Sequence, residues 1–225
     1  MLAECPKHVI FDMDGLMFDT ENLCFSCEQK AAEEFGYSVS KELFLKTLGV
    51  NHSAYCRIMR ENLGENFPAL EVSALTYRKM DDFIEKNGVP VKPGLYELLR
   101  QLDQMRIPCS VASSSHADRV RHLLQKAEIF PYFQQVIGGN MVTRSKPEPD
   151  IFLAACRAAG ISPSHSLVLE DSPNGLTAAR RANIPSICIP DLVRPSQEIL
   201  QYTSAVLSDL YEVCALFQDF HREEA

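Results

Sequence analysis

Hydrophobic and polar positions follow two rhythms along this chain. The apolar run at 7–12 ends in carboxylates and a glycine, which is typical of a strand buried on both faces of a parallel sheet. From residue 88 onward, helical and strand patterns alternate. They predict helices at 95–105, 117–127, 150–159, 174–182 and 209–220, and strands at 108–112, 134–138, 166–169, 185–189 and 205–207. Such alternation favours right-handed crossovers and one parallel sheet with helices on both faces, an α/β Rossmann-like core.

A purely helical stretch separates the first predicted strand from the others. Its helices are predicted to end at glycines, as helices often do: 21–35 before Gly36, 40–48 before Gly49, 52–63 before Gly64 and 71–86 before Gly88. A stretch of this length is too long for a connecting loop. We therefore predict an inserted all-helical cap domain at 19–87 and a discontinuous core domain at 1–18 and 88–225.

Composition narrows the class of protein. The chain has 225 residues and a formal net charge of −8, which argues against nucleic acid or an acidic membrane surface as the main partner. Its 46% hydrophobic and 23% charged residues are ordinary for a soluble globular protein. No apolar run approaches the roughly 20 residues of a spanning helix, and residues 1–6 lack the pattern of an export signal.

Cysteine usage favours a reducing compartment. The eight cysteines are scattered, and several lie inside apolar strand or helix patterns, where a free thiol acts as a small hydrophobe. Cys24 and Cys27 form a C-x-x-C, but they lie in a helical pattern with no second pair downstream. This arrangement favours helix packing over a zinc or redox site, and we expect a cytoplasmic protein.

Polar residues gather in four clusters near the predicted strand ends. The clusters are Asp12-Met13-Asp14-Gly15 through Asp19-Thr20, Ser113-Ser114-Ser115, Lys146-Pro147-Glu148-Pro149 and Glu170-Asp171-Ser172. Each has a structural alternative: turn formation by Asp12 and Asp14, capping of the helix at 117–127 by the serines, a solvated loop position for Lys146, and capping of the helix that begins at Pro173 by Asp171 or Ser172. Ligands of open parallel sheets bind at the carboxyl ends of the strands, so the four clusters can belong to one site.

Electrostatics favours a joint function for the four clusters. If the strands at 7–12 and 166–169 are neighbours, four carboxylates share one small region: Asp12, Asp14, Glu170 and Asp171. Their mutual repulsion calls for a cation, and hard oxygen ligands with room for water are typical of Mg²⁺, which also bridges to phosphate. Lys146 supplies a further positive charge, and Ser113 supplies a hydroxyl donor for a phosphoryl oxygen.

The sequence lacks the loops that bind nucleotides in kinases. Neither G-x-x-x-x-G-K-[ST] nor a G-x-G-x-x-G turn after a strand is present. We therefore expect a carboxylate nucleophile: Asp12 would attack phosphorus and form an aspartyl-phosphate, which water then hydrolyses.

The motifs resemble those of the haloacid dehalogenase-like superfamily of phosphotransferases, in the subgroup with a small helical cap that contains β-phosphoglucomutase and many phosphatases. The matching residues are Phe11-Asp12-Met13-Asp14-Gly15 with Asp19-Thr20, Ala112-Ser113-Ser114, Lys146-Pro147-Glu148-Pro149-Asp150, and Glu170-Asp171-Ser172 followed by Gly175 and Ala178-Ala179. These four motifs stand in the family's order, with the cap insertion between the first and second.

The resemblance implies a role for each matching residue. Asp12 would be nucleophile and metal ligand. Asp14 would protonate the leaving oxygen, activate water and offer its backbone carbonyl to Mg²⁺. Ser113, Ser114 and Lys146 would hold the phosphoryl group, and Asp171 and Glu170 would bind the metal. Asp14 also argues against dehalogenation, because a leaving alkoxide needs a proton and a leaving halide does not.

The resemblance leaves a phosphatase and a mutase as alternatives. β-Phosphoglucomutases have a histidine just after the Asp-Thr pair and an arginine in the cap. In this sequence those places are held by Cys24 and by the stretch Asn51-His52, and neither can replace the bidentate guanidinium of the arginine.

We therefore predict a Mg²⁺-dependent phosphatase of a sugar phosphate or nucleoside monophosphate, monomeric or weakly dimeric, with a phosphosugar mutase as the alternative activity. The non-enzymatic alternative is a metal- or phosphate-binding module.

Overall fold

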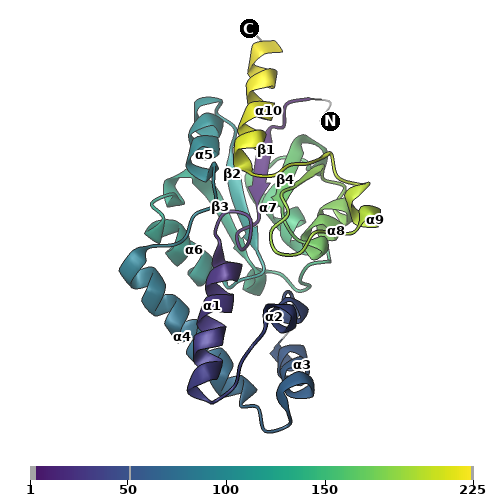
Figure 1. Cartoon of the computed structure of the whole chain (residues 1–225). Helices are drawn as coiled ribbons and strands as arrows, with labels where there is room; N and C mark the ends of the chain where they lie inside the picture. The colour runs from purple at the N-terminus through teal and green to yellow at the C-terminus, as the bar shows by residue number, and fades with distance from the viewer. Residues whose placement is uncertain (1–3, 51, 224–225) are drawn as a thin grey trace. The chain divides into compact units, whose positions relative to one another are not determined.

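The computed structural model of the chain describes residues 4–50 and 52–223 (Figure 1). Two sets of residues named in the sequence analysis lie outside the described residues. They are Asn51, from the comparison with the mutases, and residues 1–3, from the segment that lacks the pattern of an export signal. The chain forms two compact units. One unit contains the residues up to Asp19 and from Val91 onward, and the other contains Thr20–Pro90.

The first unit is built on a parallel six-stranded sheet with the order β3-β2-β1-β4-β5-β6. The strands are β1 (His8–Phe11), β2 (Cys109–Ser113), β3 (Phe133–Gly138), β4 (Ser166–Glu170), β5 (Ser186–Cys188) and β6 (Ala205–Val206). The predicted neighbourhood of the strands at 7–12 and 166–169 is confirmed by the pairing of Phe11 with Leu169. The strand order reverses at β1, which pairs with β2 on one side and β4 on the other.

Helices cover both faces of this sheet, as predicted (Figure 1). They are α5 (Leu95–Gln104), α6 (Ala117–Lys126), α7 (Asp150–Ala159), α8 (Pro173–Arg181) and α10 (Leu210–Glu223). The short α9 (Gln197–Leu200) and the 3₁₀ turns η1 (Phe130–Tyr132), η2 (Gly139–Met141) and η3 (Pro163–His165) were not predicted. They are too short to show a helical period in the sequence.

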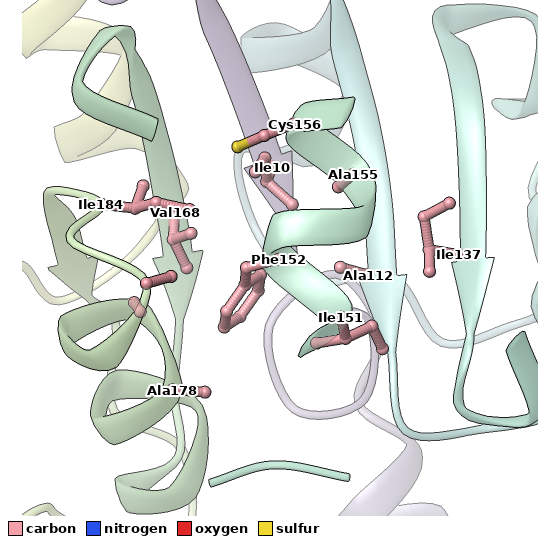
Figure 2. Close-up of a cluster of buried hydrophobic side chains, with 12 residues drawn as sticks. Ile10, Ala112, Ile137, Ile151, Phe152, Ala155, Cys156, Val168, Ala178 and Ile184 are labelled. Carbon is pink, nitrogen blue, oxygen red and sulfur yellow. The ribbon is translucent and has the colours of Figure 1, made fainter. Parts of the chain in front are cut away.

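The core of the sheet unit lies between β1, β2 and β4 and the helices α7 and α8. Figure 2 shows Phe152 and Ile151 of α7 facing Ile10, Ala112 and Val168 of the strands. All five are at most 1% exposed. Both faces of the central strands are covered, which explains why β1 is a continuous apolar run rather than an alternating one.

His8 is the polar exception in the first strand. It is fully buried, its Nδ1 lies 3.1 Å from the hydroxyl of Ser166 and its Nε2 lies 2.8 Å from the hydroxyl of Ser110. Burial lowers the pKa of His8 to about 4. The neutral ring therefore links β1 to the two strands beside it.

The lowered pKa of His8 predicts a pH-dependent stability. Between pH 6.5 and 4 the unfolded chain binds a proton at His8 and the folded chain does not. The free energy of unfolding is therefore expected to fall by up to about 3 kcal/mol as the pH drops through this range. Urea unfolding of the wild type and of His8→Gln measures the effect. Equal pH slopes in the two proteins would contradict it.

The helical unit contains α1 (Thr20–Glu34), α2 (Lys41–Thr47), α3 (His52–Leu63) and α4 (Ala69–Asn87), close to the predicted bounds. Helix α1 packs along α4, and α2 packs on α3. Ser40 begins α2, since its hydroxyl accepts from the amide of Leu43 at 3.2 Å. Gly88 ends α4 at φ 80°, where its N–H donates to Ile84, as the glycine pattern predicts.

Two further findings concern the environment of the protein. No helix among the described residues is long and apolar enough to cross a membrane. None of the eight cysteines, all of which lie in the described part of the chain, forms a disulfide.

Candidate active site

The ends of β1, β2 and β4 bring the predicted acidic and serine clusters together. Asp12 follows β1, Ser113 is the last residue of β2, and Glu170 is the last residue of β4 with Asp171 next. These strands are adjacent and parallel, so their carboxyl ends meet at one edge of the sheet where the strand order reverses. Asp12, Ser113, Glu170 and Asp171 are all buried.

Lys146 joins the acids of two strands. Its Nζ donates to Asp12 Oδ1 at 2.5 Å, to Glu170 Oε1 at 2.7 Å and to the carbonyl of Ala112 at 3.1 Å. Its side chain is only 5% exposed, and its ammonium lies 4.8 Å from the ring centre of Phe152 in α7. The alternative of a solvated loop lysine is therefore wrong.

The charges at this sheet edge are unbalanced in favour of anions. Burial raises the pKa of Asp12 to about 8, against the attraction of Lys146 and with the repulsion of Glu170 and Asp14. Burial disfavours the Lys146 cation, but the attraction of Asp12 and Glu170 is stronger and raises its pKa. One ammonium thus faces two buried carboxylates, and a further cation would favour the ionised form of Asp12.

Three carboxylates can hold such a cation. Asp12, Glu170 and Asp171 each offer an oxygen, and these oxygens lie within 4.8 Å of one another. A compact set of buried carboxylate oxygens fits a hard divalent ion such as Mg²⁺. The carboxylate of Asp14 is not in this set. Its Oδ2 accepts a hydrogen bond of 2.9 Å from the hydroxyl of Ser115.

Glu170 is fixed by the start of α8. Its Oε2 accepts from the amide of Ser172 at 2.8 Å and from the hydroxyl of Ser172 at 3.0 Å. The same hydroxyl accepts from the amide of Gly175 at 3.1 Å, so Ser172 caps α8 as one of the alternatives predicted. The side chain of Ser172 therefore both caps α8 and orients Glu170.

Gly175 makes room for Glu170 and provides a test of this packing. A Cβ at residue 175 would lie 1.6 Å from Glu170 Oε1. Without that clash, alanine in a helix would be more stable than glycine by up to about 1 kcal/mol. We expect Gly175→Ala to lower the free energy of unfolding by about 2 kcal/mol instead, measured by urea unfolding. A gain in stability would show that Glu170 is not held against this helix.

The residues of the serine run differ in burial and in hydrogen bonding. Ser113 is buried and its Oγ accepts from the amide of Ser115 at 3.1 Å, so its own hydroxyl proton can serve another acceptor. Ser114 is exposed. Helix α6 is capped by His116, whose Nδ1 accepts a hydrogen bond of 3.4 Å from the backbone amide of Asp118. The alternative that the serines cap this helix is therefore wrong.

The sequence analysis assigned no individual role to three residues of this region. Ser115 contacts Asp14, and its place in the serine run was the only available signal. Asp191 has a buried Oδ2 that accepts no hydrogen bond from the described residues. Lys92 donates to Asp191 Oδ1 at 2.5 Å and lies 3.5 Å from Asp19 Oδ1.

Gly15 lies between the carboxylates of Asp171 and Asp191. A Cβ at residue 15 would lie 2.4 Å from Asp171 Oδ2 and 3.3 Å from Asp191 Oδ2. The residue also has φ +86°, which glycine adopts without strain. The backbone after β1 can therefore run close to the acidic side chains.

Comparison with known proteins establishes the family. The model of the family described as "Haloacid dehalogenase-like hydrolase" matches residues 9–189. The chain belongs to this family of enzymes, which confirms the resemblance in the motifs.

Similar curated proteins are named as phosphatases. The chain is 35% identical over 209 residues to the "Probable pseudouridine-5′-phosphatase" of Drosophila melanogaster, covering 90% of this chain and 89% of that protein. It is 30% identical over 184 residues to the "Phosphorylated carbohydrates phosphatase" of Thermotoga maritima, covering 80% and 82%.

Solved structures show the same fold. CbbY from Rhodobacter sphaeroides in complex with phosphate has a TM-score of 0.76 at 22% identity, covering 92% of this chain and 96% of that one. A haloacid dehalogenase family hydrolase from Deinococcus radiodurans R1 has a TM-score of 0.79 at 21% identity, and the match covers 96% of each chain.

Proposed function

We propose that the protein is a Mg²⁺-dependent phosphatase of a small phosphorylated metabolite, a sugar phosphate or a nucleoside monophosphate. The observation that carries this proposal is the set of buried carboxylates at the ends of β1 and β4, bridged by Lys146. The relatives named as phosphatases support it. We further propose that residues 1–18 and 88–225 act as the catalytic core, that residues 19–87 act as its cap, and that the enzyme works in the cytoplasm.

In the proposed reaction, Asp12 forms a covalent bond to phosphorus. A carboxylate oxygen of Asp12 attacks the phosphoryl group, and the bond from phosphorus to the substrate oxygen breaks. Asp14 gives its proton to the leaving oxygen. Asp14 then takes a proton from water as that water attacks phosphorus, which releases phosphate and restores Asp12. The hydrogen bond from Ser115 to Asp14 orients the acid for both steps.

Other side chains in this proposal stabilise charge. Lys146 and the hydroxyl of Ser113 would hold the oxygens of the transferring phosphoryl group, with Ser114 beside them. Asp12, Glu170, Asp171 and the backbone carbonyl of Asp14 would hold Mg²⁺. The ion would neutralise charge that develops on the phosphoryl oxygens.

A phosphate-release screen over a panel of sugar phosphates and nucleoside monophosphates tests this function. We expect turnover of at least one compound with Mg²⁺, a loss of roughly 100-fold or more in EDTA, and recovery when Mg²⁺ is returned. Turnover that is insensitive to EDTA would contradict the proposed dependence on Mg²⁺. Isomerisation of a sugar phosphate with a trace of its bisphosphate, without net phosphate release, would show the mutase instead.

A further inference from the structure

Asp191 lies in the loop that follows β5 and belongs to none of the four polar clusters. Strand β5 is the neighbour of β4 in the sheet and runs parallel to it, with Cys188 paired to Glu170. The loop after β5 therefore leaves the sheet at the same edge as the acids proposed to bind the metal. This topology brings Asp191 beside Asp171, the residue that follows β4.

The carboxylates of Asp171 and Asp191 lie together beside Gly15. An oxygen of one carboxylate lies within 4.8 Å of an oxygen of the other. A Cβ at residue 15 would be 2.4 Å from Asp171 Oδ2 and 3.3 Å from Asp191 Oδ2, so both oxygens face the same point. Two carboxylates this close repel each other, and a cation beside them would relieve the repulsion.

The two oxygens of Asp191 have different surroundings. The side chain is 8% exposed, and its Oδ1 accepts a hydrogen bond of 2.5 Å from Nζ of Lys92. Its Oδ2 is buried and accepts no hydrogen bond from any residue that the structure describes. A buried carboxylate oxygen without a donor is costly. Because Oδ2 is an oxygen near Asp171, the cation that Asp171 would bind offsets this cost.

Two lysines at this sheet edge each face two carboxylates. Nζ of Lys92 pairs with Asp191 and also lies 3.5 Å from Asp19 Oδ1. Nζ of Lys146 pairs with both Asp12 and Glu170. The two ammonium groups therefore leave an excess of negative charge beside Asp171, which attracts a divalent cation.

We propose that Asp191 is a further residue of the metal centre and that the pair Lys92 and Asp191 sets the affinity of this centre for its divalent cation. The charge of Asp191 strengthens binding at Asp171, and the opposite charge of Lys92 weakens it. The inference rests on the proposed function, because it requires a divalent cation at Asp171. It requires no water or substrate at Asp191, since Coulomb attraction acts without contact.

Titration of the full chain with Mn²⁺ measures this affinity without substrate or turnover. Mn²⁺ takes the same oxygen ligands as Mg²⁺, and the paramagnetic resonance signal of the free ion gives its Kd. Asp191→Asn retains the size of the side chain and is expected to weaken Mn²⁺ binding about 10-fold. Lys92→Met removes the opposing charge and is expected to tighten Mn²⁺ binding about 3-fold or more. Residues that only stabilise the fold would not produce shifts of opposite sign.

Two further variants provide the controls. Asp118→Asn removes one negative charge from a side chain of the same unit that is 82% exposed, and it is expected to leave the Mn²⁺ affinity unchanged. The double variant of Lys92→Met and Asp191→Asn restores the local charge and is expected to bind Mn²⁺ within about 3-fold of the wild type. Wild-type affinity in Asp191→Asn, or shifts of both single variants in the same direction, would overturn the proposal. If Asp191→Asn does not fold, unchanged or weaker binding in Lys92→Met would overturn it instead.

Metal binding and phosphate release together separate this inference from the proposed function. Mn²⁺ binding that shifts as expected in both single variants, in a protein that releases no phosphate from any compound of the panel, would support the inference and contradict the phosphatase. Phosphate release that depends on Mg²⁺, with a metal affinity insensitive to both variants, would support the phosphatase and contradict the inference. A wild-type protein that binds neither Mn²⁺ nor Mg²⁺ would overturn the proposed metal dependence and the inference with it.

Discussion

Asp12→Asn is expected to lower phosphate release by about 1,000-fold or more, because the amide oxygen is a poor nucleophile and the chain would lose the residue that accepts phosphorus. The variant retains the size of the side chain and removes one of the charges that face Lys146. Steady-state phosphate release with saturating Mg²⁺ measures the effect.

An exposed carboxylate of the same unit provides the control for Asp12→Asn. Asp118 has a side chain that is 82% exposed, and Asp118→Asn is expected to leave the rate unchanged. Full activity of Asp12→Asn would refute the assignment of Asp12 as the nucleophile. Measurable wild-type turnover that disappears in Asp12→Asn would exclude a binding module without catalysis.

Lys146→Met is expected to lower the free energy of unfolding of the metal-free protein by about 3 kcal/mol, because it leaves Asp12 and Glu170 buried without their shared cation. Urea unfolding in EDTA measures the loss. The raised pKa of Asp12 limits it, since that carboxyl can take up a proton instead of remaining charged.

The control for Lys146→Met is Lys7→Met, at an exposed position before β1, which is expected to change the free energy of unfolding by less than about 0.5 kcal/mol. A loss no larger in Lys146→Met than in Lys7→Met would mean that the contacts of Lys146 do not stabilise the fold. The same variant is expected to lose most phosphate release, because Lys146 also holds the transferring phosphoryl group in the proposed reaction.

Most of the sheet unit could be predicted because its local signals and its packing agree. The apolar run of β1 is continuous because helices cover both faces of the sheet, and a glycine such as Gly88 ends its helix by the geometry that the sequence predicts. Helix α9 was missed because its four residues contain only one turn, which carries no period.

The acidic and serine clusters could be located because each stands next to a strand end, where topology brings distant residues together. The pair Lys92 and Asp191 has no such signal, since its members lie 99 positions apart and neither belongs to a motif. The burial of Glu28 was not predicted either, because a glutamate on a helix is ordinarily exposed and only the packing of the helices buries this one.

The most direct test of the central claim is chemical trapping of the phosphorylated side chain. The protein is mixed with a turned-over substrate and Mg²⁺, quenched with borohydride, which reduces an acyl phosphate to an alcohol, and digested for mass spectrometry. We predict that residue 12 is converted to homoserine only when the substrate is present, and that no conversion occurs in Asp12→Asn. Unmodified Asp12 during active turnover in every quench, or the label on another carboxylate, would contradict a covalent role for Asp12.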